Sequence, residues 1–373
     1  MLTARRLGWA VVAAAGIAAA AVAASGPPQF LATAVRATRS TTTRADDFAP
    51  PGVSPASAKA HTTFPPPPAG ARGTVHTDTL WAQSLGLRKA LTVYLPPSYA
   101  SSPSRRFPVL YYLHGLSGNE RNWIDAGHLD QVLDSMFSAG RPEAIVVMPD
   151  GDDGWYTTWN LLPDLAACRA DRTRTERAES YCVPWPHYDD YVARDIVAHV
   201  DRRYHTLADR AHRGIAGLSM GGLGAVSLAL LYPDVFAAAA SHSGVLSPRL
   251  LAPTSTATAP RYANTVAELE TAARGLWKYM AQPFGHDTIG WAARDPRRMA
   301  TRAASKGQTL PRLRIDCGVD DQYIQQNRDF HETLVRLGVS HQYAEWSGAH
   351  TWQYWRTHVP QSVDFLLSAV GGP

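Results

Sequence analysis

The sequence predicts an α/β fold in which a mainly parallel central sheet is flanked by helices and carries a helical insertion. Three observations lead to this prediction. From about residue 73 onward short apolar runs alternate with amphipathic helical stretches, several of the runs are apolar at nearly every position, and 45% of the chain is hydrophobic against 18% charged. Parallel strands that helices cover on both faces have such continuous apolar runs. A chain of 373 residues is long enough to bury a core of this kind.

Seven strands and four helices are predicted in this part of the chain. The strands follow from the apolar runs, and the helices follow from apolar positions spaced three and four residues apart. Residues 245–311 break the alternation, and we expect them to form a helical insertion. The strands are predicted at 91–95, 109–114, 144–148, 214–218, 237–241, 313–317 and 342–346, and the helices at 188–204, 222–231, 327–337 and 355–370.

The first 72 residues are expected to lie outside the folded part. Arg5 and Arg6 precede an uncharged stretch, within residues 1–24, that ends in small residues and is typical of a signal peptide. If it is not cleaved, the stretch is long enough to serve as an N-terminal anchor. Residues 25–72 are rich in Pro, Ser and Thr and predict a disordered linker, which leaves residues 73–373 as the folded domain. We therefore expect an exported protein, secreted or in the cell envelope, with membrane contact only through an uncleaved N-terminal segment.

Charge and cysteine content argue against several classes of protein. Of the net charge of +4, the first 72 residues hold seven basic and two acidic residues, so the folded part has 29 basic residues against 30 acidic ones. Phosphate binding needs a basic surface, so no nucleic-acid partner is expected. The three cysteines contain no CxxC pair, and neither a metal nor another cofactor is predicted. Cys168 and Cys182 are candidates for a disulfide in an exported chain, whereas Cys317 is expected in a buried strand.

The sharpest functional signal is the sequence Gly217-Leu218-Ser219-Met220-Gly221, between a predicted strand and a predicted helix. This GxSxG pattern in a strand-turn-helix context is typical of a nucleophile elbow. The serine occupies a strained turn, where side chains at the flanking glycines would collide with the backbone. The pattern predicts that Ser219 is a catalytic nucleophile.

A nucleophilic serine needs a histidine to accept its proton and a carboxylate to orient that histidine. Asp320 and Asp321 follow the predicted strand 313–317, at the strand end where open α/β sheets place their sites. Either aspartate fits this role. His350 lies in a small-residue loop after the next predicted strand, which gives the chain order serine, acid, histidine.

Two backbone N–H groups are also needed to bind the oxyanion of an acyl-transfer intermediate. Met220 supplies one of them, because it directly follows the nucleophile in the elbow. The second is expected from Leu116, in the glycine-rich loop after the predicted strand 109–114. Aromatic residues follow the same loops, and Trp155 and Trp352 are candidate substrate-binding residues, with ordinary core packing as the alternative.

Five motifs, in this order, resemble the esterase D family of α/β-hydrolases. That family includes S-formylglutathione hydrolases, feruloyl and acetyl xylan esterases and the antigen 85 mycolyltransferases. The resemblance spans residues 74–370 and implies an α/β-hydrolase fold with Ser219 as nucleophile, Asp321 as acid and His350 as base, and with Leu116 and Met220 as oxyanion donors. The motifs are His114-Gly115-Leu116-Ser117-Gly118-Asn119, Val147-Met148-Pro149-Asp150-Gly151, the Ser219 elbow, Cys317-Gly318-Val319-Asp320-Asp321 and His350-Thr351-Trp352.

Antigen 85 proteins usually differ from this chain at three of these places, since they carry Asp where His114 stands, Ala after the elbow methionine where Gly221 stands, and Glu as the acid. The chain is therefore more similar to the hydrolase branch, and the sequence predicts a secreted serine esterase that cleaves carboxylic esters through an acyl-enzyme. Its substrate is expected to be a small-molecule, lipid or polysaccharide-linked ester. Two alternatives remain: an antigen 85-like envelope acyltransferase that acts on a sugar or lipid alcohol, and a catalytically idle binding module on a proline-rich stalk.

Overall fold

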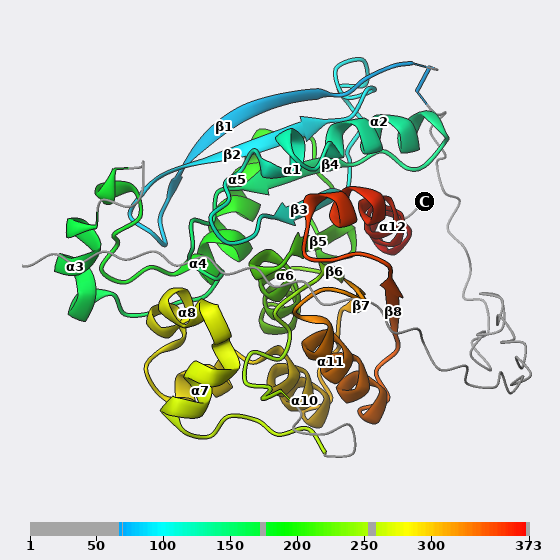
Figure 1. The fold of residues 1–373 in the computed structure, drawn as a ribbon. Helices are drawn as coiled ribbons and strands as arrows, with labels where there is room; N and C mark the ends of the chain where they lie inside the picture. Colours follow the sequence, from blue (N-terminus) through cyan, green and yellow to red (C-terminus); the bar gives the residue numbers. More distant parts are fainter. Residues whose placement is uncertain (1–66, 69, 172–176, 253–258, 371–373) are drawn as a thin grey trace, which may run out of the picture. The chain divides into compact units, whose positions relative to one another are not determined.

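Eight strands form one sheet in the order β1-β2-β4-β3-β5-β6-β7-β8 (Figure 1). β1 pairs antiparallel with β2, β2 pairs antiparallel with β4, and all the other neighbours are parallel. This is the mainly parallel sheet that the sequence predicts. The strands are β1 (Thr74–Ala82), β2 (Leu87–Leu95), β3 (Val109–Leu113), β4 (Ile145–Pro149), β5 (Arg213–Leu218), β6 (Ala238–His242), β7 (Arg312–Gly318) and β8 (His341–Trp346).

The computed structural model describes residues 67–68, 70–171, 177–252 and 259–370. The expected leader, residues 1–24, and the expected linker up to residue 66 lie outside the described residues. All described residues belong to one unit, Ala60–Pro373, and its first strand begins at Thr74. No helix in the described part of the chain is both long enough and apolar enough to cross a membrane.

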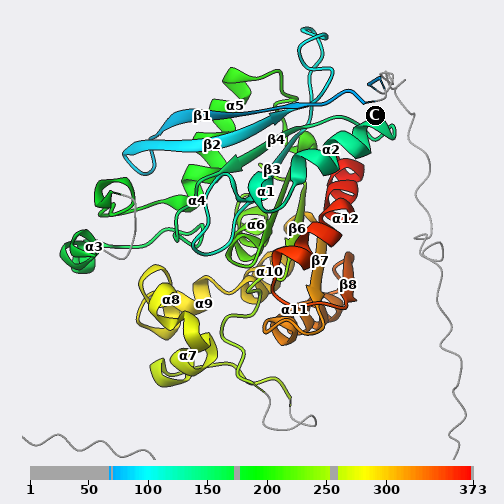
Figure 2. The same ribbon diagram turned by 45° about the horizontal axis from the view of Figure 1, so that its top comes forward.

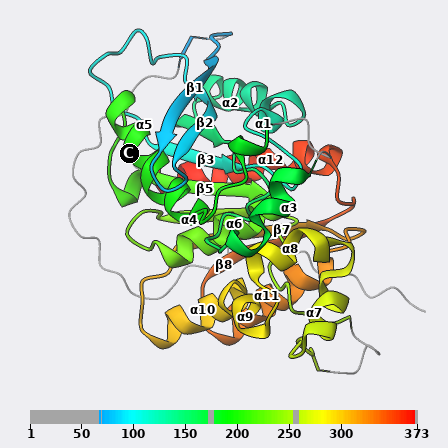
Figure 3. The same cartoon turned by 90° about the vertical axis from the view of Figure 1, so that its left-hand side faces the viewer.

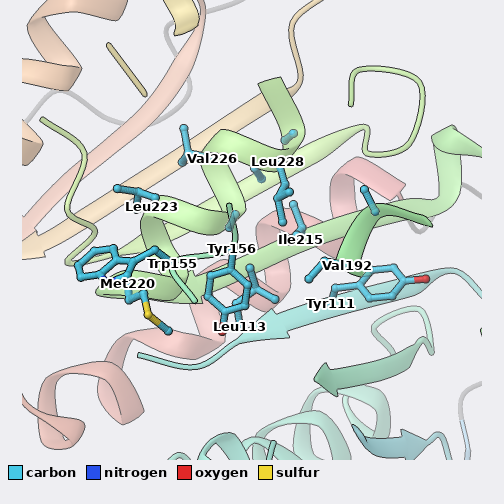
Figure 4. Close-up of a cluster of buried hydrophobic side chains, with 14 of the residues drawn as sticks. Tyr111, Leu113, Trp155, Tyr156, Val192, Ile215, Met220, Leu223, Val226 and Leu228 are labelled. Atoms are coloured by element: carbon cyan, nitrogen blue, oxygen red, sulfur yellow. The ribbon is translucent and has the colours of Figure 1, made fainter. Parts of the chain in front are cut away.

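Helices cover both faces of the sheet and bury two hydrophobic clusters (Figure 2). Successive side chains of a strand point to opposite faces, so Tyr111 and Tyr112 of β3 belong to different clusters. Figure 4 shows the first cluster, in which Tyr111 and Ile215 lie opposite Val226. On that face lie α4 (Tyr188–Asp190), a π-helical stretch (Tyr191–Ile196), α5 (Val197–Arg203), α6 (Met220–Leu231) and α11 (Ile324–Arg336); on the other lie α1 (Asn122–Asp125), α2 (Leu129–Ser138) and α12 (Trp352–Val370).

Residues 245–311 contain the predicted helical insertion. It comprises α7 (Val266–Ala273), α8 (Trp277–Phe284), α9 (Thr288–Ala293) and α10 (Pro296–Ser305), of which α7 and α8 are the yellow helices in Figure 1. Three of these helices begin at a residue whose side chain accepts a backbone N–H, namely Thr265, Asp287 and Asp295. α10 packs against α6 and α11 (Figure 3), so the insertion is joined to the main fold.

The predicted elements are present with shifted boundaries, and a few elements were not predicted. The predicted helix 188–204 contains the π-helical stretch between α4 and α5. The sequence does not predict the edge strand β1, because its residues 76–79 are polar and interrupt any apolar run, although Leu80 and Ala82 are buried. α2 and the short α3 (Leu165–Ala170) were also not predicted.

Candidate active site

Ser219 occupies the turn between β5 and α6 with φ 55° and ψ −118°. A non-glycine residue in this region is strained, as a nucleophile elbow requires. The two flanking glycines are explained by close backbone contacts. A Cβ on Gly217 would lie 2.2 Å from the carbonyl oxygen of Gly221, and a Cβ on Gly221 would lie 2.4 Å from the carbonyl oxygen of Leu113. Any side chain at either position would force the turn open.

A continuous hydrogen-bonded chain joins Ser219, His350 and Asp321. His350 Nε2 lies 2.9 Å from Ser219 Oγ, and His350 Nδ1 lies 2.8 Å from Asp321 Oδ2. The carboxylate can only accept, so Nδ1–H donates to it and Nε2 is left free to accept the serine proton. Asp321 is 2% exposed, and its other oxygen accepts the Tyr323 backbone N–H at 2.8 Å. Asp320 is exposed, so the structure selects Asp321 as the partner of the histidine.

The three residues meet because their loops follow parallel strands, whose carboxyl ends lie at one edge of the sheet. The loops after β7 and β8 are also in direct contact, since a Cβ on Gly318 would lie 2.1 Å from the carbonyl oxygen of Gly348. Two aromatic rings pack edge-on against His350, those of Tyr323 and Trp355, with centroid distances of 5.0 and 4.9 Å. Burial and the neighbouring Asp321 carboxylate raise the pKa of Tyr323 to about 12, so this ring stays neutral.

The glycine-rich loop after β3 lies against the serine elbow. A Cβ on Gly115 would lie 2.7 Å from Leu218 Cδ1 and 3.5 Å from Ser219 Cβ. The next residue along this loop is Leu116, and Met220 is the first residue of α6. Within the described part of the chain neither of these two backbone N–H groups donates a hydrogen bond, which leaves both available to an oxygen of a bound ester.

Hydrogen bonds of His114 hold this loop in place. Its Nε2 accepts the Gly151 backbone N–H at 2.9 Å, and its Nδ1 lies 2.8 Å from the Gly115 carbonyl oxygen. The Tyr156 hydroxyl donates to the His114 carbonyl oxygen at 3.1 Å. Burial lowers the pKa of His114, which keeps the ring neutral and its Nε2 able to accept. Hydrogen bonds therefore fix both the backbone and the side chain of His114 at the start of the loop.

The two candidate substrate-binding tryptophans lie in different environments. Trp155 is 1% exposed and packs edge-on against Phe284, so the structure places it in the core and gives it no exposed surface for a substrate (Figure 4). Trp352 is partly buried and packs edge-on against Trp123 and Trp355, and Trp355 is the ring that touches His350. Packing thus accounts for the position of both tryptophans.

A cavity of about 700 Å³ begins beside the glycine-rich loop, at Ser117. The Ser117 N–H donates to Asp153, which lies on the same cavity wall. Cys168 also lines the cavity and forms a disulfide with Cys182 across a Cα–Cα distance of 5.9 Å. The further lining residues are Asp152, Gly154, Trp159, Leu161, Ala167, Asp171, Tyr181, Tyr188, Lys278, Tyr279, Gln282 and Pro283.

One group among the described residues has the arrangement of a metal site, and it lies apart from Ser219 in the chain. His187, Asp189 and Asp190 each place a ligand atom within 4.8 Å of the others. Both carboxylates already have protein partners, because Asp189 accepts the Thr158 hydroxyl and Asp190 accepts the Tyr232 hydroxyl. These contacts give the carboxylates a structural role at the start of α4.

Sequence analysis did not identify two buried polar residues behind the elbow, His242 and Asp316. Both are fully buried and hydrogen-bonded to each other at 2.9 Å. Their sequence signal is weak, since each occurs within or directly after an apolar run and neither belongs to a motif. Only the pairing of β6 with β7 brings them together.

Comparisons with known proteins show which family the chain resembles. The model of the Esterase family, described as "Putative esterase", matches residues 82–366. An acetyl esterase of Caldicellulosiruptor saccharolyticus is 25% identical over 265 residues, which cover 70% of this chain and 84% of that protein. An esterase of Mycobacterium tuberculosis is 31% identical over 167 residues, which cover 44% of this chain and only 31% of that protein.

Solved structures extend the likeness to the whole fold. A ferulic acid esterase superposes with a TM-score of 0.55 at 25% identity, over 81% of this chain and 100% of that chain. A fluorophosphonate-binding serine hydrolase of Staphylococcus aureus superposes with a TM-score of 0.59 at 21% identity, over 79% of this chain and 99% of that chain. The family match covers most of the described residues, and the sheet has the matching architecture. The chain therefore belongs to the Esterase family of α/β-hydrolases and is a carboxylic ester hydrolase.

Proposed function

We propose that the chain hydrolyses carboxylic esters through an acyl-enzyme on Ser219. The single observation that carries this proposal is the hydrogen-bonded chain from Ser219 through His350 to Asp321. His350 Nε2 takes the proton of Ser219 Oγ while this oxygen attacks the ester carbonyl carbon. His350 then gives the proton to the leaving alcohol as the C–O bond breaks, and a water molecule attacks the acyl-enzyme by the same route in reverse.

Charge develops at two places during these steps. The carbonyl oxygen becomes an oxyanion, and the proposed acceptors of its charge are the N–H groups of Leu116 and Met220, with Met220 also at the positive end of α6. The imidazole of His350 becomes a cation, which the buried Asp321 carboxylate stabilises across 2.8 Å. In a closed site each oxyanion donor contributes about 3 to 4 kcal/mol to the stability of the transition state.

The proposed substrates are esters whose acyl groups range from acetate to ferulate, because the relatives are named for acetyl and ferulic acid esters. Water is the proposed acyl acceptor. The proposed place for the alcohol part of the ester is toward the cavity that Ser117, the neighbour of Leu116 in the chain, helps to line.

Export is a further part of this proposal. Its support is the composition of residues 1–24 together with the Cys168–Cys182 disulfide, a bond that persists in oxidising compartments. Expression of the full chain, followed by fractionation and N-terminal sequencing, tests it. A protein retained in the cytoplasm with both thiols reduced would contradict it.

The test of the chemistry compares wild-type protein with Ser219→Ala and with the matched variant Ser227→Ala on p-nitrophenyl acetate and methyl ferulate. Ser227 is a buried serine in α6 whose hydroxyl has no partner among the described residues, so its loss should leave turnover within about twofold. We expect Ser219→Ala to lower kcat by about 10⁶-fold. A fluorophosphonate probe should label the wild type and Ser227→Ala at Ser219, as located by peptide mass. Turnover by Ser219→Ala near the wild-type rate would refute the proposal.

A further inference from the structure

A second hydrogen-bonded chain of serine, histidine and aspartate lies buried behind the Ser219 elbow. His242 Nδ1 lies 2.9 Å from Asp316 Oδ1, and His242 Nε2 lies 2.8 Å from Ser362 Oγ. All three residues are 0% exposed. A substrate has no access to these side chains, so they do not form a second reactive centre.

This buried chain is tied to the backbone of the nucleophile. The Ser219 N–H donates to the carbonyl oxygen of His242 at 2.9 Å. The next residue, Ser243, has φ 49° and donates its N–H to the carbonyl oxygen of Asp316 at 2.7 Å. A non-glycine residue stays in this strained conformation only where its surroundings fix it. The backbones of both members of the buried pair are therefore bonded to the strained segments at the ends of β5 and β6.

The same chain is tied to the loop that carries His350. The Tyr354 hydroxyl donates to Asp316 Oδ1 at 3.2 Å, and the Tyr354 ring packs against the loop glycine Gly348, where an added Cβ would lie 2.8 Å from its Cδ2. Trp355 makes a parallel connection, because its Nε1–H donates to Ser243 Oγ at 3.3 Å while its ring packs edge-on against His350. Asp316 is thus bonded both to the strand end next to Ser219 and to Tyr354, which packs against the loop of His350.

The arrangement is costly for folding, which calls for an explanation. Asp316 Oδ2 is buried without a hydrogen bond, and the nearest cation, Arg314 Nε, lies 3.9 Å away, beyond hydrogen-bond distance. Apolar residues of similar volume at such positions are often neutral or stabilising. His242 and Asp316 form a buried pair that carries this cost and that contacts the residues around Ser219 and His350. Such a pair is suited to fixing the relative position of the two reacting side chains.

We propose that His242 and Asp316 are positioning residues for the reaction at Ser219. Their contacts hold the backbone of Ser219 and the loop of His350 so that Oγ and Nε2 stay at hydrogen-bond distance. The inference rests on the proposed role of Ser219. Displacement of reacting groups by about 1 Å can cost about 100-fold in rate. A positioning role therefore predicts a loss in kcat with little change in KM.

The test uses two tyrosine hydroxyls that bond to opposite ends of this buried chain. Tyr354→Phe removes the bond to Asp316 on the side of the active site, and Tyr112→Phe removes the bond to Ser362 at 3.2 Å on the far side. Each variant loses one buried hydroxyl and keeps its ring, so both melting temperatures should fall by about 2 to 4 °C. We expect Tyr354→Phe to lower kcat about tenfold at unchanged KM, since a rate loss of this size follows from a shift well under 1 Å. Tyr112→Phe should stay within twofold of the wild type. Equal effects of the two variants on kcat would overturn the inference.

Two substitutions of the histidine itself sharpen the test. The amide of His242→Asn can donate from the place of Nδ1 and keep the bond to Asp316, whereas the amide of His242→Gln reaches the place of Nε2 and keeps only the bond to Ser362. The asparagine variant should retain at least fivefold more kcat than the glutamine variant. The pH at which kcat/KM falls on the acid side should be the same in both, because the contacts of His350 with Asp321 are retained. A reversed order, or a shift of that pH, would contradict a positioning role.

The labelling rate of Ser219 by a fluorophosphonate probe separates this inference from the proposed function. Labelling of Ser219 in every variant, but at the same rate in Tyr354→Phe and Tyr112→Phe, would overturn the positioning role alone. Full turnover by Ser219→Ala would instead remove the proposed function on which it rests.

Discussion

Asp321→Asn should invert the hydrogen bond that orients His350. One carboxylate oxygen of Asp321 accepts the Tyr323 backbone N–H, and the other accepts His350 Nδ1–H, each at 2.8 Å. An asparagine has one acceptor oxygen, and Tyr323 N–H, a donor fixed in the backbone, engages it. The NH₂ group must then face His350 Nδ1. The imidazole proton moves to Nε2, which can no longer accept the proton of Ser219.

The size of the effect follows from this tautomer change. Loss of the correct tautomer, with geometry preserved, lowers kcat by about 10⁴-fold in a serine hydrolase triad. That factor corresponds to about 5 kcal/mol of transition-state stabilisation. KM should change by less than about threefold, because Asp321 is buried and has no surface for a substrate. The loss should therefore fall almost entirely on kcat.

Asp320→Asn is the matched control, since Asp320 is the adjacent residue and is exposed, while the hydrogen bond to His350 comes from Asp321. Both variants are assayed for kcat and KM on p-nitrophenyl acetate, and thermal melts verify that both are folded. Asp320→Asn should stay within about twofold of the wild type, as exposed substitutions usually do. The reasoning is refuted if Asp321→Asn keeps more than a tenth of the wild-type kcat, or if Asp320→Asn loses as much.

Three further predictions concern packing, pH and the disulfide. Gly221→Ala should lower kcat about 100-fold, because its Cβ would lie 2.4 Å from the carbonyl oxygen of Leu113, the last residue of β3, and would push the loop of Leu116 away. Gly275→Ala is the control, since a Cβ there would meet nothing within 4 Å, and its kcat should equal that of the wild type. Burial raises the pKa of Asp295 to about 6, above its unfolded value, so the stability it gives below about pH 4 is lost as the pH rises through 6. Urea unfolding at pH 4 and at pH 7 tests this. Between these two pH values the unfolding free energy of the wild type should fall by about 3 kcal/mol more than that of Asp295→Asn, and equal falls would contradict the prediction. Replacing both Cys168 and Cys182 by serine should lower the unfolding free energy by about 3 kcal/mol, and reductant should shift the melt of the wild type but not that of the variant.

The fold was predictable because its strands carry local signals. β3, β4 and β5 are buried at every position, and a strand buried on both faces shows an uninterrupted apolar run. The strand order carries no such signal, since β4 lies between β2 and β3 although it follows both in the chain. β1 is an edge strand whose polar residues 76–79 leave it without an apolar run, although Leu80 and Ala82 are buried in the first cluster.

The site was predictable to the extent that its chemistry depends on neighbours in the chain. Gly217 and Gly221 are required by backbone contacts of the turn itself, and this local requirement makes the elbow visible in the sequence. The choice between Asp320 and Asp321 depends on which side chain turns inward toward His350, and adjacent residues in a loop give no such information. Trp155 shows the same limit, because its loop position suggested a rim while Phe284, far along the chain, buries it.

β6 holds the two sides of the site together, although none of its residues is a candidate site residue in the sequence. β6 contributes no member of the Ser219–His350–Asp321 chain, yet it lies between β5, which precedes the serine, and β7, which precedes the acid. Any tilt of β6 would therefore change the distance between the two sides of the reaction. His242 and Asp316 are register partners in the parallel strands β6 and β7, and their side chains are hydrogen-bonded to each other at 2.9 Å. A side-chain bond between paired strands resists such a tilt, because backbone pairing alone permits variable twist. An apolar pair at these positions could fill the same volume, but it would have no directional bond with which to fix the register of the serine against the acid.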